Sequence, residues 1–243
     1  MLKIIERIGL PITNTSGIDC YEDCLDKKHF RNYPKEITYQ YNSRGFRDLE
    51  WPDKLTDVIW CVGDSFTVGI GQPQDEIWPR ILEKRTGKRC LNLGEDGCSN
   101  DTLALRAQEI CRLYKPKLIV VMWSFFPRRR INDKDIQFDK NDFGAKEDLI
   151  NFAKNFKIVD SLPTNIIHLL IPNACIDIDK WFRQKLDYIF IQSDLLNNQQ
   201  IKSILTFSQL DYARDCHHFD IKTSNHVCDL IMEKTNNFDK TSK

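Results

Sequence analysis

Short, largely apolar segments alternate with amphipathic segments from residue 57 onward. The apolar segments are continuous, a pattern typical of strands that are buried on both faces of a parallel sheet. Gly63, Gly94 and Pro172 follow three of these segments and mark where a strand would end. The pattern therefore predicts five strands, at residues 58–62, 90–93, 118–123, 166–171 and 188–191.

Three of the segments between or after these strands have helical periodicity. The strongest pattern places five side chains on one helix face, those of Leu103, Ala107, Ile110, Cys111 and Tyr114. Ser99 or Asn100 is available as the N-cap of this helix. Two further helices are expected over residues 78–85 and 224–234. Strands that alternate with helices predict right-handed βαβ units, and hence a three-layer α/β/α fold around a parallel sheet of about five strands. Ligands of such sheets bind at the carboxyl ends of the strands.

Two regions lack this periodicity. Residues 1–56 contain turn-forming stretches, so we expect an irregular N-terminal extension that packs on a single domain formed by residues 57–243. Residues 128–146 are rich in charge and include three consecutive arginines. We interpret this second region as a solvated loop.

Composition limits the classes of partner. The 243 residues include 35 Lys and Arg and 35 Asp and Glu, and the pI is near 6.9, so no general attraction to nucleic acid or to an anionic membrane is expected. No apolar run approaches the roughly 18 residues of a membrane span, and charge interrupts the N-terminal apolar stretch too early for a signal peptide. The nine cysteines are an odd number and several lie in apolar segments, which indicates buried thiols. We therefore expect a soluble, cytoplasmic protein in a reducing compartment.

The cysteines do not form a convincing metal site. Cys20 and Cys24 have the spacing C-x3-C and His29 lies nearby, but no second Cys/His pair follows at a zinc-finger interval. Cys216 adjoins His217, yet catalytic Cys–His pairs are usually assembled from separate segments. We therefore expect no metal ion and no cofactor.

A serine directly follows the first predicted strand. The sequence Gly63-Asp64-Ser65 places it on a tight turn at the carboxyl end of that strand, where a nucleophile would be displayed. The alternatives are a plain structural turn and a phosphate-binding loop, as in a flavodoxin-like nucleotide or flavin binder. Neither G-x-x-x-x-G-K-[ST] nor G-x-G-x-x-G is present, and no lysine follows to reach a phosphate.

An acid and a histidine lie three positions apart before the last predicted helix. The Asp215 carboxylate can accept a hydrogen bond from one ring nitrogen of His218, which leaves the other nitrogen free to take the proton of a serine. The alternative is that His217 and His218 are surface residues of a loop.

Three sequence blocks together resemble a known family. Gly63-Asp64-Ser65, the segment Asn92-Leu93-Gly94-Glu95-Asp96-Gly97, and Asp215 with His218 are similar to the first, second and fifth blocks of the SGNH (GDSL-type) hydrolases. These are esterases and acyl hydrolases on a flavodoxin-like α/β/α fold, and the resemblance covers residues 57–235. It implies that Ser65 is the nucleophile, His218 the general base and Asp215 its orienting acid.

The resemblance also implies an oxyanion hole. The backbone N–H groups of Ser65 and Gly97 would point into it, and glycine at position 97 would leave room for a close approach of the substrate. The third block departs from the family pattern, because Gly-x-Asn-Asp is replaced by Met122-Trp123-Ser124-Phe125. Ser124 is the candidate to donate in place of the missing asparagine, the alternative being a core or capping role.

The resulting functional hypothesis is a serine esterase. Its substrate would carry a small acyl group, such as acetyl on a carbohydrate, because no long apolar stretch suggests a lipid substrate. Asp64 and Arg129 are candidate substrate-binding residues. The alternative is a catalytically degenerate SGNH-fold protein with a binding or structural role. The third block and residues 41–47 are similar to SGNH-like proteins of tailed bacteriophages, for which the location would be the virion.

Overall fold

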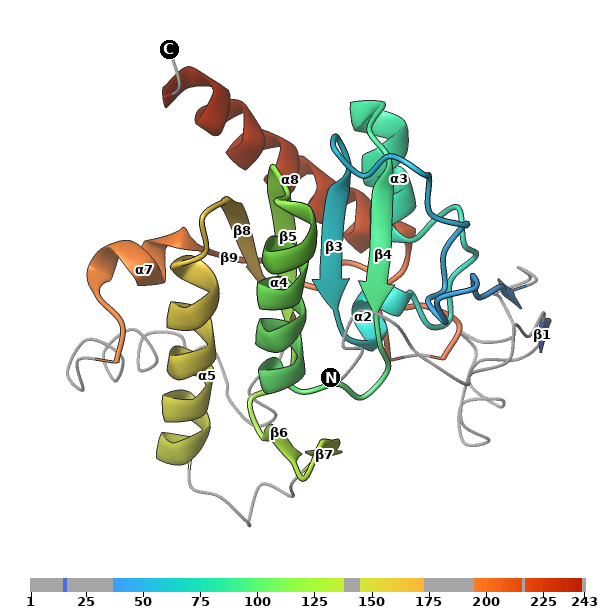
Figure 1. The fold of residues 1–243 in the computed structure, drawn as a ribbon. Helices are drawn as coiled ribbons and strands as arrows, with labels where there is room; N and C mark the ends of the chain where they lie inside the picture. The colour runs from blue at the N-terminus through green and yellow to red at the C-terminus, as the bar shows by residue number, and fades with distance from the viewer. Residues whose placement is uncertain (1–14, 17–36, 138–144, 173–194, 216, 242–243) are drawn as a thin grey trace.

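A five-stranded parallel sheet forms the centre of the computed structural model, which describes residues 15–16, 37–137, 145–172, 195–215 and 217–241 (Figure 1). The strands run in the order β4-β3-β5-β8-β9, and all neighbouring pairs are parallel. This is the flavodoxin-like doubly wound order, so the predicted fold class is confirmed. The strands are β3 (Ile59–Gly63), β4 (Cys90–Gly94), β5 (Leu118–Trp123), β8 (Asn165–Leu170) and β9 (Ile204–Thr206).

The fifth strand of the sheet differs from the prediction. β9 has only three residues, none of them fully buried, and it pairs with β8 at the edge of the sheet. Such a short strand has no hydrophobic pattern by which it could be predicted. The segment 188–191, predicted as the fifth strand, lies outside the described residues.

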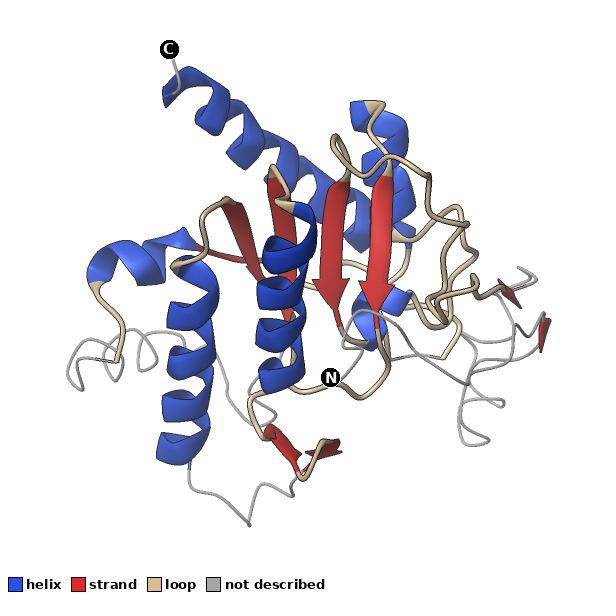
Figure 2. Cartoon of the chain, viewed as in Figure 1, coloured by secondary structure: helices blue, strands red, loops and turns tan. Residues whose placement is uncertain are grey.

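Helices cover both faces of the sheet (Figures 1 and 2). α4 (Asn100–Tyr114) and α5 (Ala145–Asp160) pack together on one face, and α3 (Trp78–Thr86) packs with α8 (Ile221–Thr241) on the other. Two short helices, α2 (Ser65–Val68) and α7 (Asn198–Ser203), lie in the connections.

Local signals fix the helix ends. Ser99 is the N-cap of α4, and its Oγ accepts a hydrogen bond from the backbone N–H of Thr102 at 3.3 Å. α3 has Pro79 in its first turn and ends at Gly87, whose φ is +66°. All three predicted helices are present, although α8 extends beyond residues 224–234 at both ends.

The interpretation of residues 128–146 as a solvated loop is wrong for the described part of that segment. β6 (Arg128–Ile131) and β7 (Lys134–Gln137) form an antiparallel hairpin near the carboxyl end of the sheet (Figure 1). The two turn residues between them have positive φ values of 48° and 63°, as a type I′ turn requires. Asp135 accepts hydrogen bonds from the hydroxyls of Ser99 and Thr102, at 2.5 and 2.6 Å. The three arginines and Asp135 of the hairpin are thus paired with protein groups.

The described part of the N-terminal extension packs on the sheet edge formed by β4. β1 (Thr15–Ser16) pairs antiparallel with β2 (Thr38–Tyr39). Phe46 is completely buried in the core, and the Asp48 carboxylate accepts a hydrogen bond from the backbone N–H of Asn92 at 3.1 Å.

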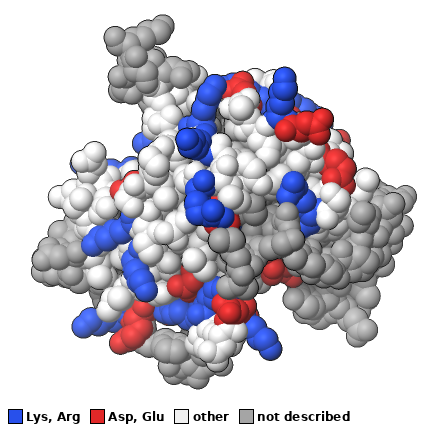
Figure 3. Space-filling view, viewed as in Figure 1, with Lys and Arg blue, Asp and Glu red and all other residues white. Residues whose placement is uncertain are grey.

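Basic and acidic side chains are intermixed on the face of the molecule shown in Figure 3. This mixture agrees with the equal numbers of basic and acidic residues in the chain. Among the described helices, none has the length and apolar character that a membrane span requires.

The fit of β4 against α2 gives a first prediction. A Cβ added at Gly94 would lie 2.4 Å from the backbone nitrogen of Val68 and 2.7 Å from the carbonyl carbon of Thr67, so α2 would have to move. Gly94→Ala is therefore expected to lower the free energy of unfolding by about 3 kcal/mol, which is the upper end of the cost of overpacking a core. Urea denaturation of the native chain and the variant measures this change.

Gly87→Ala is the matched control. A Cβ at Gly87 would meet no atom within 4 Å, and only its φ of +66° opposes alanine, at a cost of about 1 kcal/mol. Equal losses for the two variants would contradict the close contact between β4 and α2.

Candidate active site

Ser65 begins α2 directly after β3, at the carboxyl end of the sheet (Figure 1). Gly63 makes this tight turn possible, because a Cβ there would lie 2.0 Å from Oγ1 of Thr67. Asp64 is the N-cap of α2, and its Oδ1 accepts a hydrogen bond from the backbone N–H of Phe66 at 3.1 Å. As the first residue of the helix, Ser65 has a backbone N–H with no carbonyl partner in the helix itself.

Asp215 and His218 lie on the loop that precedes α8. Oδ1 of Asp215 accepts hydrogen bonds from the backbone N–H groups of His217 and His218, at 2.9 and 3.0 Å, and Oδ2 accepts from Nδ1 of His218. Burial alone would raise the pKa of Asp215, but the hydrogen bonds from the His218 ring and from the two amides lower that pKa below its usual value. An ionised carboxylate in this position favours the tautomer that carries its proton on Nδ1.

The structure brings the three predicted catalytic residues together. Nε2 of His218 lies 2.8 Å from Oγ of Ser65, so one hydrogen-bonded chain runs from the serine through the imidazole to Asp215. All three residues are buried. The ring of Phe66 lies with its centroid 4.6 Å from that of His218 and covers one side of the imidazole. This geometry meets the hydrogen-bond criterion for a serine and its general base.

A second histidine lies beside the first. His217 is more exposed than His218 but still partly covered, and its ring centroid is 5.0 Å from that of His218 in an edge-on arrangement. Partial burial lowers the pKa of His217, and the neighbouring His218 lowers it further. The two adjacent histidines therefore differ in environment, and only His218 contacts Ser65.

Gly97 lies on the turn after β4, at the same sheet edge as Ser65, because the preceding strand residues Gly63 and Gly94 are paired. An added Cβ at position 97 would meet no protein atom within 4 Å, so packing inside the protein does not require glycine there. The backbone conformation does favour glycine, with φ at +72°.

The hydroxyl of Ser124 faces Asp64. It donates a hydrogen bond to Oδ2 of Asp64 at 2.6 Å and accepts one from Nη1 of Arg128 at 2.8 Å. Arg128 also forms an ion pair with Asp64, at 2.9 Å. Because a serine hydroxyl has one proton, Ser124 in this arrangement has no proton left to donate to a substrate.

The two predicted substrate-binding residues have partners inside the protein. Asp64 is completely buried; burial raises its pKa, and Arg128 and Ser124 oppose that rise. Arg129 forms an ion pair with Asp148 and donates a hydrogen bond to the backbone oxygen of Phe126. The structure therefore places both side chains in intramolecular contacts around the site.

Two residues of the site were not predicted from the sequence. Nδ2 of Asn100 donates to the backbone oxygens of Ser124 and Phe125, at 3.2 and 3.4 Å, and Oδ1 accepts from the backbone N–H of Ser124 at 2.8 Å. Asn100 thus fixes the end of β5. Arg128 is the second residue, and its only sequence signal is that a run of arginines directly follows the altered third block.

The described cysteines are free thiols in apolar surroundings. Burial raises the pKa values of Cys61 and Cys98, and raises the pKa of Cys228 to about 12. In the part of the chain that the structure describes, no three His, Cys, Asp or Glu residues are grouped so as to hold a metal ion. The pair Cys20 and Cys24, with His29 and Cys216, lies outside the described residues.

Comparison with solved structures finds several of similar fold. The psychrotrophic esterase EstA from Pseudoalteromonas sp. has 16% identity and a TM-score of 0.49, over 75% of this chain and 98% of that one. A family two carbohydrate esterase from Clostridium thermocellum has 15% identity and a TM-score of 0.49, over 78% of this chain and 66% of that one. A member of the lipolytic protein G-D-S-L family from Veillonella parvula has 13% identity and a TM-score of 0.45, over 72% and 96%.

The similarity is confined to structure. No family model matches the chain, and no curated protein matches it by sequence. Because the TM-scores are below 0.5, these similarities carry no functional argument. The strand order is that of the flavodoxin-like α/β/α fold expected from the sequence, and Ser65, Asp215 and His218 meet at the carboxyl end of its sheet.

The ion pair between Asp64 and Arg128 gives a second prediction. Arg128→Met leaves a buried carboxylate without its cation and is expected to lower the free energy of unfolding by about 3–5 kcal/mol at pH 7. Burial already raises the pKa of Asp64 above 3.8, and loss of Arg128 raises it further. An acid whose pKa is raised in the folded state loses stability as the pH rises through that pKa, so the deficit should shrink toward pH 4.

Urea denaturation between about pH 4 and pH 7 measures this dependence. The double variant Asp64→Asn/Arg128→Met is the control, because it removes the unpaired charge and should recover part of the loss at pH 7. A deficit in Arg128→Met that is independent of pH would show that the carboxylate is not its source.

Proposed function

We propose that the protein is a serine esterase that works through Ser65, His218 and Asp215. The observation that carries this proposal is the continuous chain of hydrogen bonds from Oγ of Ser65 through both ring nitrogens of His218 to Asp215. A serine hydroxyl is a weak nucleophile unless a base is oriented to remove its proton. Here the base lies within reach and its orientation is fixed by a carboxylate.

The reaction follows from these positions. Ser65 Oγ attacks the ester carbonyl carbon while Nε2 of His218 takes its proton, and the imidazolium is stabilised by Asp215. His218 then gives that proton to the leaving alcohol, which yields an acyl-serine. A water molecule, activated by the same imidazole, hydrolyses the acyl-serine. These proton transfers require neither a metal ion nor a cofactor.

The oxyanion hole is the less complete part of the proposed site. The backbone N–H groups of Ser65 and Gly97 are its proposed donors, and each such donor contributes about 2.7–4 kcal/mol to transition-state stabilisation. Ser124 is the candidate third donor from the sequence, but its hydroxyl proton is bonded to Asp64. To act as a donor, the Ser124 hydroxyl would have to rotate and donate its hydrogen bond to the oxyanion instead of to Asp64, with Arg128 remaining as the cation beside Asp64.

The proposed substrate is an ester with a small acyl group, such as acetyl on a carbohydrate. The chain contains no long apolar stretch that would suggest a lipid acyl chain.

A non-catalytic binding or structural role, as in a virion, is the second candidate. The hydrogen bond from Ser124 to Asp64 favours it, because this contact leaves the hole without a side-chain donor from the third block. The two candidates differ in whether Ser65 reacts as a nucleophile.

Labelling with a fluorophosphonate probe tests the proposal without knowledge of the natural substrate. The native chain should become labelled on Ser65, since the probe requires only an activated serine. Ser65→Ala should abolish labelling, and His218→Ala should slow it strongly, while EDTA should leave the rate unchanged. A folded native chain that is labelled no faster than Ser65→Ala would exclude the esterase and leave the binding role.

Ser124→Ala tests the third donor. Because the hydroxyl is bonded to Asp64 and Arg128, this variant is expected to keep kcat within a few-fold of the native value and to lower the melting temperature. If kcat instead falls by about 100-fold with KM unchanged, Ser124 does donate to the oxyanion in the transition state. Ester hydrolysis and thermal melting of the same preparations distinguish the two results.

A further inference from the structure

We propose that Arg47, in the N-terminal extension, positions Ser65 against the loop that carries Asp215 and His218, here called the acid–base loop. The proposal rests on the proposed function, because it concerns the reactivity of the same serine. It assigns a role in the site to the segment formed by residues 37–50, here called the N-terminal strap. This strap lies outside the three sequence blocks that resemble SGNH hydrolases.

The guanidinium of Arg47 holds the end of the turn that carries Ser65. Arg47 is buried, with 1% of its surface exposed. Its Nη1 donates to the backbone oxygens of Val68 and Gly69, and its Nη2 donates to that of Gln72 at 2.7 Å. The carbonyls of Val68 and Gly69 lie at the end of α2, where no further helical turn follows, and a cation is favourable at this end of a helix. The Gly69 oxygen also accepts a hydrogen bond from the backbone N–H of Gln72 at 3.2 Å.

A tyrosine of the strap supports the same loop. The ring of Tyr39 lies 4.1 Å from the guanidinium carbon of Arg47, and its hydroxyl accepts a hydrogen bond from the backbone N–H of Gly71 at 2.9 Å. The strap therefore holds residues 68–72 through two side chains that also contact each other.

The loop held by the strap contacts the acid–base loop directly. The backbone oxygen of Gly71 accepts a hydrogen bond from Arg214, the residue before Asp215, at 3.2 Å. A Cβ on Gly71 would lie 2.9 Å from Cβ of Ala213 and 3.3 Å from the backbone nitrogen of Asp215. Gly71 thus joins the turn that carries Ser65 to the loop that carries Asp215 and His218. Any shift of this loop changes the distance from Ser65 to its base.

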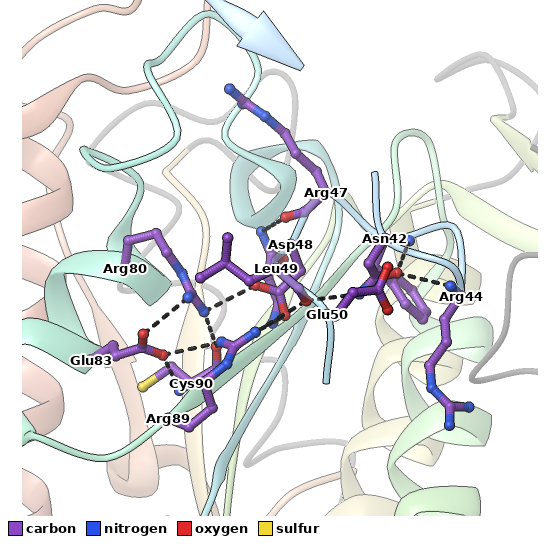
Figure 4. A network of polar contacts seen from close by, with 12 residues as sticks. Asn42, Arg44, Arg47, Asp48, Leu49, Glu50, Arg80, Glu83, Arg89 and Cys90 are labelled. Atoms are coloured by element: carbon purple, nitrogen blue, oxygen red, sulfur yellow. Dashed lines mark hydrogen bonds and ion pairs between the residues drawn. The ribbon is translucent and has the colours of Figure 1, made fainter. Parts of the chain in front are cut away.

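The strap is itself anchored on β4. The backbone oxygen of Arg47 accepts from Nδ2 of Asn92 at 3.1 Å, and the next residue, Asp48, forms ion pairs with Arg80 and Arg89, at 3.1 and 2.9 Å (Figure 4). In Figure 4 the side chain of Arg47 points away from this network. The network therefore holds the backbone of the strap in place, while the side chain of Arg47 contacts the turn after α2.

Two substitutions separate positioning from general stability. Arg47→Met removes the donors to the turn, whereas Arg80→Met removes a buried guanidinium from the same strap network without a contact to residues 65–72. Arg47→Lys keeps the charge but cannot reproduce a planar fork that reaches three carbonyls. The readouts are the rate of fluorophosphonate labelling well below the melting temperature, the melting temperature itself, and kcat and KM for an ester.

Arg47→Met is expected to slow labelling by about 10- to 100-fold relative to Arg80→Met, because a displacement near 1 Å in a reacting group costs up to 10²-fold. Arg47→Lys should lie between Arg47→Met and the native chain, and the loss should fall on kcat with KM little changed. Labelling of Arg47→Met within threefold of Arg80→Met would overturn the proposal.

The remaining outcomes separate a failure of the role of Arg47 from a failure of the proposed function. If Arg47→Met does not fold, Tyr39→Phe removes one hydrogen bond to the same loop and should slow labelling by about fivefold; an unchanged rate would overturn the proposal. If the native chain is labelled no faster than Ser65→Ala, the proposed function fails, and the role of Arg47 fails with it. Labelling of the native chain with equal rates in Arg47→Met and Arg80→Met overturns the role of Arg47 alone.

Discussion

The buried carboxylate of Asp64 connects the parts on which the site depends. It caps the helix that begins with Ser65, accepts a hydrogen bond from Ser124 at the end of β5, and forms an ion pair with Arg128 at the start of β6. A completely buried carboxylate costs several kcal/mol unless it is paired with a cation and hydrogen-bonded. Keeping an ionised aspartate at this N-cap therefore requires a nearby cation, which explains why the arginine-rich segment folds back onto the site.

Close backbone contacts set the position of Ser65. A four-residue helix has almost no stability of its own. The position of α2 is therefore set by the elements that pack against it. Gly63 and Gly94 have no room for a Cβ against this helix, and Gly71 has none against the loop before Asp215. Three glycines thus determine how closely the first two strands, α2 and the acid–base loop approach one another. The hydrogen bond between Ser65 and His218, which joins residues 153 positions apart, depends on those approaches.

The features predicted from the sequence are those with a local signal. The four longer strands of the sheet are continuous apolar runs, and the helix that begins at Asn100 has both its periodicity and its capping Ser99 nearby. The candidate residues Ser65, Asp215 and His218 could be proposed because each follows or precedes such an element. β9 and the β6–β7 hairpin could not, since their short strands are polar or half exposed. Arg128 pairs with a residue 64 positions away, and no pattern within the charged segment indicates that partner.

On the proposed function, activation of the serine and stabilisation of the oxyanion are separate tasks, and the site is better equipped for the first. The first needs only the hydrogen-bonded chain from Ser65 to Asp215, which is complete. The second needs donors aimed at a charge that exists only in the transition state. In the third block, the neutral donor of an asparagine is replaced by Ser124 and Arg128, whose hydrogen bonds converge on Asp64. On the proposed function, such a site forms the acyl-serine mainly with esters whose leaving groups make the oxyanion less costly, and its rate depends on backbone donors that the strap and the glycine contacts hold in place.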